Sequence, residues 1–567
     1  MAALIAALPL PAGAQTPALP QGSPLPRVVP PVMPSAVPAT GLQPLPAPGT
    51  EVPNQPVRVI NVTVEGVTAF PAADIAQLAD GLVGPAVPLP KIDAARQAIL
   101  QRYRSEGYAL TTVSVKSDAA GRLRFVVVEG KIVSVKLQGD IGPAGVQVLR
   151  FLDRLMDPDN QPIRSDQLER YLLLAQDVPG VTLRAVVEPS AEQPGAMNLI
   201  AQVSRQAVSG SVSFDNRAFD QTGPVQGLLA MNFNSFTQYG ERTEVSFYHT
   251  FLNSQNFGQI STEGFIGSSG LRLKVYGGRG MANPDGTLAA GGYEGTTTIF
   301  GAQLAYPLIR SRQQTLNLVA SIDMLDSEIQ TGKPTLVRGS FDALRVLRIG
   351  EQYAYSDTWL GASRSGYNTI AAKVSHGLRV LGATTSGTAG DSPRQHERSD
   401  FLKFDFEATR TQTLFTPWEG ASVALMALVT GQWTDMILPP AEEFYLGGSR
   451  FTRGYYAGQV PGDKALAATA ELQLNTAYDL PFFRTDASVA AQFYIFYDWG
   501  ETWQTQGSDF ATKVASVGGG TRLQITRFAE LDLEAVGRLN RYPTGGANTG
   551  ATALKDVGLY WRLLGRF

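Results

Sequence analysis

The sequence predicts a mixed fold in which two small α/β modules precede a transmembrane antiparallel β-barrel. Charged residues make up only 17% of the 567-residue chain, below the roughly 25% of typical soluble domains. Upstream of residue 208, one order of strands and helices occurs twice. Downstream of it, strand-like segments place apolar residues on one side and charged residues on the other, as in a barrel wall.

The composition excludes several classes of function. The chain has no cysteine, which rules out disulfide scaffolds, CxxC zinc sites and thiol nucleophiles. Its three histidines lie far apart in the sequence, which argues against metal or triad chemistry. The formal net charge of −3 argues against a nucleic-acid-binding surface. We therefore expect no catalytic residue, no metal and no cofactor, and we do not expect an enzyme.

The first 56 residues are predicted to lack a folded core. Residues 1–14 form an apolar run ending in Ala-Gly-Ala, which is typical of a signal-peptide cleavage site. No basic residue precedes this run, so we expect the signal peptide to begin further upstream; a flexible apolar tail is the alternative. Residues 15–56 are predicted to be an extended linker, because 15 of the 36 prolines lie within residues 1–56.

Residues 57–130 are predicted to form the first module. The β-branched alternation of residues 57–66 indicates a strand. Residues 71–82 indicate a helix with proline in its first turn, and residues 91–105 place apolar residues at helical spacing. Two more strands are expected after the Gly-Tyr pair at 107–108.

Residues 131–207 are predicted to repeat this order as a second module. The expected elements are a strand at 131–139, helices around 144–155 and 165–176, and strands at 181–189 and 197–205. The repeat indicates two copies of one structural unit. Two generic α/β modules that pack on another surface remain the alternative.

The repeated unit resembles the POTRA domain, a periplasmic module. The resemblance rests on the order of elements, the Gly-Tyr pair and the VVVEGKI junction at residues 126–132. The segment LERYLLLAQDVPGVTLRAVVEP, residues 168–189, resembles the second POTRA domain of two-partner secretion transporters. The resemblance implies capture of an extended polypeptide by strand addition to a sheet edge.

Residues 208–567 are predicted to form the barrel. In residues 401–408 and 528–535, charged and apolar residues alternate, so that carboxylates would lie on one side of each strand. A soluble β-sandwich alternates in the same way, so periodicity does not decide between them. All six tryptophans lie in this region, as aromatic girdles require: Trp359, Trp418, Trp433, Trp499, Trp503 and Trp561.

The end of the chain favours the barrel. The segment DVGLYWRLLGRF has a face formed by Val557, Leu559, Trp561, Leu563 and Phe567, and it resembles the closing strand of bacterial outer-membrane proteins. The region has enough residues for about 14 to 18 tilted strands of about 9–11 residues with their connections. Family resemblance implies 16 strands.

A long loop at residues 437–464 holds the first functional motif. Loops of this length inside a compact domain are usually functional. Its centre, Thr-Arg453-Gly454-Tyr455, resembles the VRGY/F loop of the two-partner secretion and barrel-assembly superfamily, with threonine in place of valine. The resemblance implies that the loop folds into the barrel lumen.

The second motif is FYDWG at residues 496–500. It resembles the F/G-x-D-x-G strand motif of the same families, with Phe496, Asp498 and Gly500 at the motif positions. The apolar residues of this strand fall on the opposite face, so Asp498 is predicted to point into the lumen. We predict that Arg453 pairs with Asp498 and holds the loop in its transport-competent conformation. Taken singly, Arg453 would be a solvated loop arginine and Asp498 an ordinary lumenal acid.

A third segment, SVSFDNRAFDQTG at residues 211–223, resembles the first barrel strand and turn of the family. The matching positions are Asp215, Asn216, Thr222 and Gly223. A generic hairpin turn uses the same residue types. Family members often carry a pore-plugging helix before the first module, but the prolines of residues 17–55 disfavour a long helix there.

On these motifs the chain is identified as a member of the two-partner secretion transporters (TpsB type), the haemolysin secretion/activation and filamentous-hemagglutinin transporter family. The resemblance implies a monomer in a Gram-negative outer membrane, in contact with lipid, with its POTRA domains in the periplasm. Its expected partner is one large unfolded exoprotein of the adhesin or cytolysin class. The sequence has no G-x-x-x-x-G-K-[ST] motif, so folding of the cargo outside is the expected driving force.

Three other functions are less compatible with the sequence. A barrel-assembly insertase of the same superfamily is the main alternative, but it typically carries more than two POTRA modules. An outer-membrane lipase would need a nucleophile and a base, whereas His249 and His376 lie in strand-like segments without a nearby serine–acid set. A passive porin would not need POTRA domains.

Overall fold

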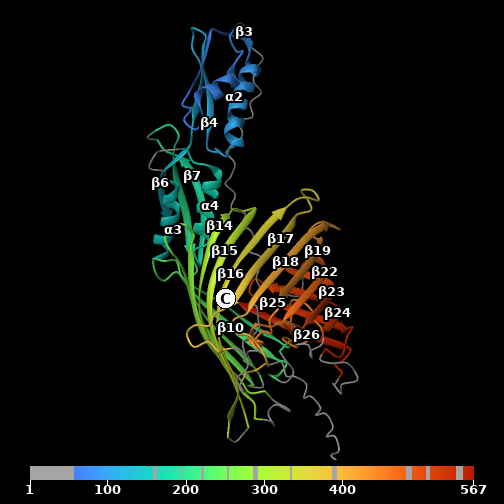
Figure 1. The fold of residues 1–567 in the computed structure, drawn as a ribbon. Helices are drawn as coiled ribbons and strands as arrows, with labels where there is room; N and C mark the ends of the chain where they lie inside the picture. Colours follow the sequence, from blue (N-terminus) through green and yellow to red (C-terminus); the bar gives the residue numbers. More distant parts are fainter. Residues whose placement is uncertain are drawn as a thin grey trace, which may run out of the picture.

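The computed structural model consists of two α/β modules that extend from one end of a closed barrel (Figure 1). It describes residues 56–156, 162–191, 193–218, 222–251, 254–284, 292–332, 335–385, 392–479, 488–505, 511–543 and 553–567. The expected signal peptide at 1–14, and the expected linker at 15–56 except its last residue, lie outside the described residues. No helix in the described part of the chain is long and apolar enough to cross a membrane.

The first module packs its helices against two small sheets. Its elements are β1 (Pro56–Val59), β2 (Asn61–Glu65), α1 (Ala72–Ala76), the 3₁₀ helix η1 (Gln77–Ala79), β3 (Gly84–Pro88), α2 (Leu89–Ser105), β4 (Thr112–Ser117) and β5 (Arg122–Val128). The sheets have the orders β1-β3 and β2-β5-β4. The core face of α2 carries Ile92, Ala95, Ile99 and Tyr103 at the predicted helical spacing.

The start of this module differs from the prediction. The single strand expected at 57–66 is wrong, because the chain bends at Ile60 and changes partner: β1 pairs with β3, whereas β2 pairs in parallel with β5. Strand β3 is absent from the sequence prediction. The helix expected at 71–82 is shorter, since α1 passes into η1 and the chain turns at Gly81, whose φ of 74° suits glycine.

One carboxylate ties the connection after β2 to the end of β5. Glu129 accepts hydrogen bonds from the backbone amides of Thr68 (2.9 Å) and Ala69 (3.0 Å) and from the hydroxyls of Thr68 and Tyr103. Tyr103 is fully buried. Burial raises the pKa of Glu129, but the hydrogen bonds from Ala69, Thr68 and Tyr103 outweigh it, so the pKa lies below its ordinary value.

We expect Glu129→Gln to lower the free energy of unfolding of this module by about 1–3 kcal/mol, because one carboxylate oxygen and its charge are lost. A carboxyl whose pKa is depressed by folding stabilises the fold above its unfolded pKa, and this contribution is lost as the pH falls through the folded pKa. The backbone amides of this module in wild type should therefore lose protection from hydrogen exchange as the pH falls below 4.5, the ordinary pKa of a glutamate. The variant should lack this pH dependence.

Hydrogen exchange of residues 57–130 in the full chain, at neutral and acidic pH, measures this effect. Glu106→Gln is the matched control, since Glu106 lies on the same module but pairs with Arg102 at an exposed site. Equal protection of wild type and Glu129→Gln at neutral pH would contradict the assignment.

The second module repeats the order of the first. Its elements are β6 (Lys131–Gln138), α3 (Ala144–Leu152), η2 (Asp153–Leu155), α4 (Ser165–Gln176), β7 (Val181–Pro189) and β8 (Ala196–Arg205). The sheet order is β6-β8-β7, with β6 and β8 parallel. The helix expected around 144–155 is α3 followed by a 3₁₀ turn, whereas α4 has the predicted bounds.

The barrel closes with the predicted 16 strands. In order they are β9 (Val208–Asp215), β10 (Gln226–Asn234), β11 (Arg242–Thr250), β12 (Gln255–Phe265), β13 (Arg272–Ala282), β14 (Glu294–Arg310), β15 (Gln314–Thr331), β16 (Val337–Asp357), β17 (Gly366–Gly377), β18 (Leu402–Phe415), β19 (Ser422–Trp433), β22 (Lys464–Asp479), β23 (Ser488–Trp503), β24 (Thr512–Thr526), β25 (Ala529–Arg538) and β26 (Val557–Arg566). Neighbouring strands are antiparallel, and β26 pairs with β9 to close the ring. The backbone of Phe567 continues this pairing with Gly210.

The second module is fixed to one end of the barrel. Phe151 of α3 packs against Phe265 at the end of β12, with ring centroids 5.1 Å apart. Asp177, directly after α4, accepts two hydrogen bonds from the guanidinium of Arg310 at the end of β14, at 2.7 and 2.8 Å. The turns that follow β12 and β14 therefore lie at the end of the barrel that carries the two modules.

The barrel wall is polar inside and apolar outside, as the alternation predicts. Glu530 and Glu534 of β25 pair with Arg562 and Arg217 on the lumenal side. On β26, alternate residues such as Leu559 are exposed on the outer surface. The interior is thus suited to water and charged chains, and the exterior to lipid.

Candidate functional site

The loop between β19 and β22 folds back into the lumen. Residues 434–463 contain the 3₁₀ helix η4 (Pro440–Glu442) and a small hairpin of β20 (Phe444–Leu446) and β21 (Val460–Gly462). The prediction set this loop at 437–464, close to its observed ends. The hairpin encloses a turn in which Gly447 and Gly448 have φ values of 103° and 112°, a conformation that favours glycine.

Arg453, at the tip of this loop, is hydrogen-bonded to two carboxylates and lies 3.7 Å from a third, that of Glu534. Its Nε and Nη2 donate to Asp498 Oδ2 and Oδ1, both at 3.0 Å, and its backbone amide donates to the same carboxylate at 2.8 Å. Its Nη1 donates to Glu471 of β22. The guanidinium also lies over the ring of Phe496, 3.4 Å from the centroid. Arg453 is 2% exposed and Asp498 has no exposed surface.

The strand register explains why these groups meet. Thr469 of β22 pairs with Asp498 of β23, and Glu471 pairs with Phe496, so alternate residues of both strands project into the lumen at one level. Phe493, Ile495 and other residues of opposite parity are exposed outside. A buried guanidinium requires this kind of paired, hydrogen-bonded surrounding, and the planar fork of arginine fits a carboxylate in bidentate fashion.

The other motif residues allow the loop to approach the wall closely. A Cβ on Gly454 would come within 2.9 Å of the Cβ of Ser516, and a Cβ on Gly500 within 2.9 Å of the Cγ2 of Thr452. The buried Tyr455 hydroxyl donates to the carbonyl of Asn540 at 2.7 Å. Glycine is therefore required at 454 and 500 for packing, and Tyr455 anchors the loop to the strands beyond β23.

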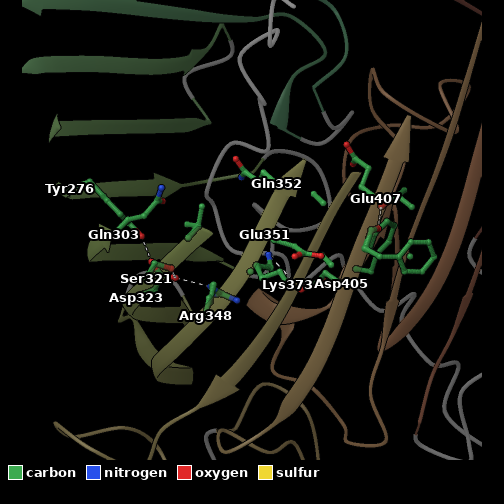
Figure 2. Close-up of a pocket in the computed structure, with 18 residues that line it drawn as sticks. Tyr276, Gln303, Ser321, Asp323, Arg348, Glu351, Gln352, Lys373, Asp405 and Glu407 are labelled. Carbon is green, nitrogen blue, oxygen red and sulfur yellow. Dashed lines mark hydrogen bonds and ion pairs between the residues drawn. The ribbon is translucent and has the colours of Figure 1, made fainter. Parts of the chain in front are cut away.

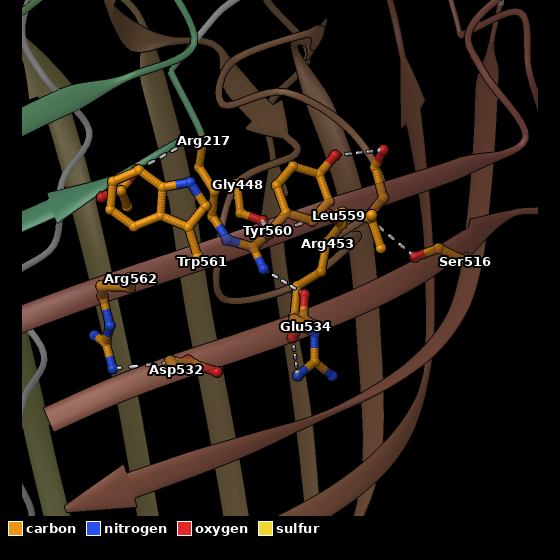
Figure 3. A network of polar contacts seen from close by, with 12 residues as sticks. Arg217, Gly448, Arg453, Ser516, Asp532, Glu534, Leu559, Tyr560, Trp561 and Arg562 are labelled. Carbon is orange, nitrogen blue, oxygen red and sulfur yellow. Dashed lines mark hydrogen bonds and ion pairs between the residues drawn. The ribbon is translucent and has the colours of Figure 1, made fainter. Parts of the chain in front are cut away.

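Sequence reasoning missed Arg217, which also holds the loop (Figure 3). It follows β9 and donates to the carbonyls of Gly448 (3.3 Å) and Arg453 (3.2 Å). It pairs with Glu534 of β25, and its guanidinium lies 4.1 Å from the ring centroid of Tyr560. Its position inside the third predicted segment, next to Asn216, was the available signal.

A second cluster, also missed, holds the base of the loop on strands β15, β16 and β18. Glu442 of η4 accepts hydrogen bonds from Arg348 Nη2 of β16 at 2.6 Å and forms an ion pair with Lys403 Nζ of β18 at 2.9 Å. Arg348 also pairs with Asp323 of β15 at 2.6 Å. Lys403 was part of the predicted alternation, but the sequence did not indicate its partner. The loop thus has one charged anchor on β16 and β18 and another on β22 and β23.

A lumenal cavity of about 470 Å³ lies beside the loop (Figure 2). Its walls include Tyr276, Asp323, Arg348 and Lys373, and Phe444 of the loop. In the described residues, no cluster of histidine, aspartate or glutamate could hold a metal ion. The cavity is lined by polar and charged side chains of the wall and by Phe444 of the folded-in loop.

Comparison with known proteins gives matches over most of the chain. The family model described as "Haemolysin secretion/activation protein ShlB/FhaC/HecB" matches residues 197–523, and the model described as "POTRA domain, ShlB-type" matches residues 57–130. The heme/hemopexin transporter protein HuxB of Haemophilus influenzae (strain 86-028NP) is 21% identical over 457 residues, covering 79% of this chain and 77% of HuxB.

Solved structures share the architecture. CdiB from Escherichia coli has a TM-score of 0.69 at 17% identity, covering 93% of both chains. CdiB from Acinetobacter baumannii has a TM-score of 0.61 at 16% identity, covering 91% of both chains. BamA from Haemophilus ducreyi lacking POTRA domains 1–3 has a TM-score of 0.51 at 11% identity. These likenesses show a common fold of POTRA-type modules and barrel.

Proposed function

Since the chain belongs to the haemolysin secretion/activation family of ShlB, FhaC and HecB, which are outer-membrane exporters of partner exoproteins, we propose that it passes one large unfolded exoprotein of the adhesin or cytolysin class through its lumen. The observation that carries this proposal is the loop of residues 434–463, which lies inside the barrel on charged anchors beside a polar cavity. A transporter needs such a movable element, because an open barrel of this size would leak.

Residues 57–130 and 131–207 are two POTRA domains that receive the exoprotein in the periplasm, and residues 208–567 are the barrel. In the strand pairing of the described residues, the edges of the three-stranded sheets available for an added strand are β2 and β4 in the first domain and β6 and β7 in the second. Main-chain pairing at such an edge accepts an extended segment with little regard for its side chains. The transporter acts as a monomer.

The pairing of Arg453 with Asp498 keeps the loop in its transport-competent conformation. The contact is buried, bidentate and supported by Glu471, so it fixes the position of the loop tip as well as its charge. Gly454, Tyr455, Phe496 and Gly500 provide the close packing that this pairing requires.

Co-expression with the exoprotein encoded beside its gene, in a Gram-negative host that lacks both, tests the function. We expect the exoprotein in the medium with the full chain, and in the periplasm when residues 57–130 are deleted at an equal level of folded barrel. HuxB is named as a heme/hemopexin transporter protein, so an exoprotein that binds haem or hemopexin is the second cargo to test. No export of any cargo, together with loss of other barrels from the outer membrane upon depletion, would favour the insertase alternative instead.

A further inference from the structure

A charged cluster lies on the outer, lipid-facing surface of the barrel. On β18, Lys403 contacts the lumenal loop and residues alternate from there, so Arg410 projects outward. Asn368 of β17 pairs directly with Arg410. Asp357 ends β16, and β16, β17 and β18 are neighbours in the wall (Figure 1). The cluster is thus formed by three consecutive strands on the face that contacts lipid.

The cluster lies at the periplasmic border of the apolar band. Asp357 directly precedes the turn from β16 to β17, and alternate turns of an antiparallel barrel lie at one end. The turn after β14 contacts the second module through Arg310, so the turn after β16 also lies on the periplasmic side. Further along β17 and β18 the outward residues are apolar, including Ile370 and Phe404.

The guanidinium of Arg410 is held rigidly and keeps one donor free. Its Nη1 and Nη2 donate to Asp357 Oδ2 and Oδ1 at 2.8 and 3.1 Å, Nη1 also donates to Asn368 at 2.7 Å, and Nη2 donates to Gln412. Its Nε has no acceptor among the described residues. The Arg410 side chain is 30% exposed, and it lies 5.0 Å from the ring centroid of Trp359.

An amphipathic pocket of about 430 Å³ adjoins this guanidinium. Arg410 and Gln412 line one part of it, and the remainder is apolar: Trp359, Leu360, Leu414, Leu425 and Ala427. A charge facing hydrocarbon is unfavourable, and it becomes less so at headgroup depth. Tryptophan and tyrosine are typical of this depth, and Tyr355 lies beside Trp359 with ring centroids 6.3 Å apart.

We propose that this pocket binds a phospholipid of the periplasmic leaflet, with its phosphodiester at Arg410 and an acyl chain along Leu414 and Leu425. Arginine presents fixed N–H donors that suit phosphate oxygens, and its Nε is the donor that the protein leaves unused. Asp357 balances the charge of Arg410, so the site suits a zwitterionic headgroup that carries both a phosphate and an ammonium group. The bound lipid would cover the charged cluster and fix the depth of the β16–β18 wall in the membrane.

Native mass spectrometry of the full chain in detergent, titrated with phosphatidylethanolamine, tests this proposal. We expect one tight adduct with wild type, and about a tenfold weaker adduct when Arg410→Gln and Asp357→Asn are combined, because both charges are removed and the polar side chains retained. Trp359→Ala should weaken the adduct less. Diacylglycerol with the same acyl chains should bind as weakly to wild type as the phospholipid binds to the double variant.

The matched control is Arg279→Gln, since Arg279 also projects outward, from β13, near the opposite end of the barrel. It should leave the adduct unchanged. Equal binding of phospholipid by wild type and the double variant, or equal binding of diacylglycerol, would overturn the proposal. A dimer that dissociates in the double variant would assign this surface to contact between two copies of the chain. Altered mobility of the unheated barrel in electrophoresis identifies any variant that is misfolded.

Discussion

Export of the exoprotein is expected to fall by more than about tenfold when Arg453 is replaced by alanine. The substitution removes the cation that pairs with Asp498 and leaves Glu471 with Arg522. Breaking a buried ion pair by removing one partner costs about 3–5 kcal/mol, and each 1.4 kcal/mol corresponds to about a factor of ten in population. The docked conformation of the loop should therefore lose most of its population.

The measurement is the amount of exoprotein in the medium at equal levels of folded barrel. Asp498→Ala should cause a similar loss, and the double variant should be little worse than either single one, because both residues form one contact. Arg453→Lys should retain part of the export, since lysine keeps the charge but lacks the bidentate geometry. These variants separate the role of charge from that of geometry.

Arg450→Ala is the matched control within the same loop. Arg450 pairs with Glu407 at a site where its side chain is 42% exposed, so its removal should leave export unchanged. Full export by Arg453→Ala would contradict the role of the pair while leaving the transport function intact.

The features that depend on regular alternation along a strand, or on helical spacing of apolar residues, could be predicted from the sequence. The lumenal face of β23 follows from alternation, so the direction of Asp498 was accessible before its partner was known. The helix α4 and the strand β7 have the predicted bounds for the same reason. The family motifs then supplied the link between Asp498 and Arg453, which lie 45 residues apart.

The contacts that depend on how distant elements meet could not be predicted. Glu442 lies on an irregular turn, and its partner Arg348 lies 94 residues earlier, on β16. Their meeting depends on the path of the loop through the lumen, and no local pattern encodes that path. The division of the first strand into β1 and β2 likewise depends on tertiary pairing, since the residues around Ile60 have one continuous β pattern.

The anchor at Glu442 is expected to control the size of the pore. Glu442→Ala removes the carboxylate that balances Arg348 and Lys403, although Arg348 keeps Asp323 as a partner. The loss of about 3 kcal/mol would lower the population of the docked loop base by about a hundredfold. We expect a larger and more variable conductance of the purified chain in planar lipid bilayers.

Asp435→Ala is the control for this experiment, because Asp435 lies in the same loop but is exposed. It should leave the conductance as in wild type. Unchanged conductance of Glu442→Ala would show that the tip contact alone holds the loop in the lumen. Increased conductance with export retained, set against the loss of export in Arg453→Ala, would assign different roles to the two anchors: the contact at Asp498 would position the loop for transport, and the contact at Arg348 would keep the passage narrow between transport events.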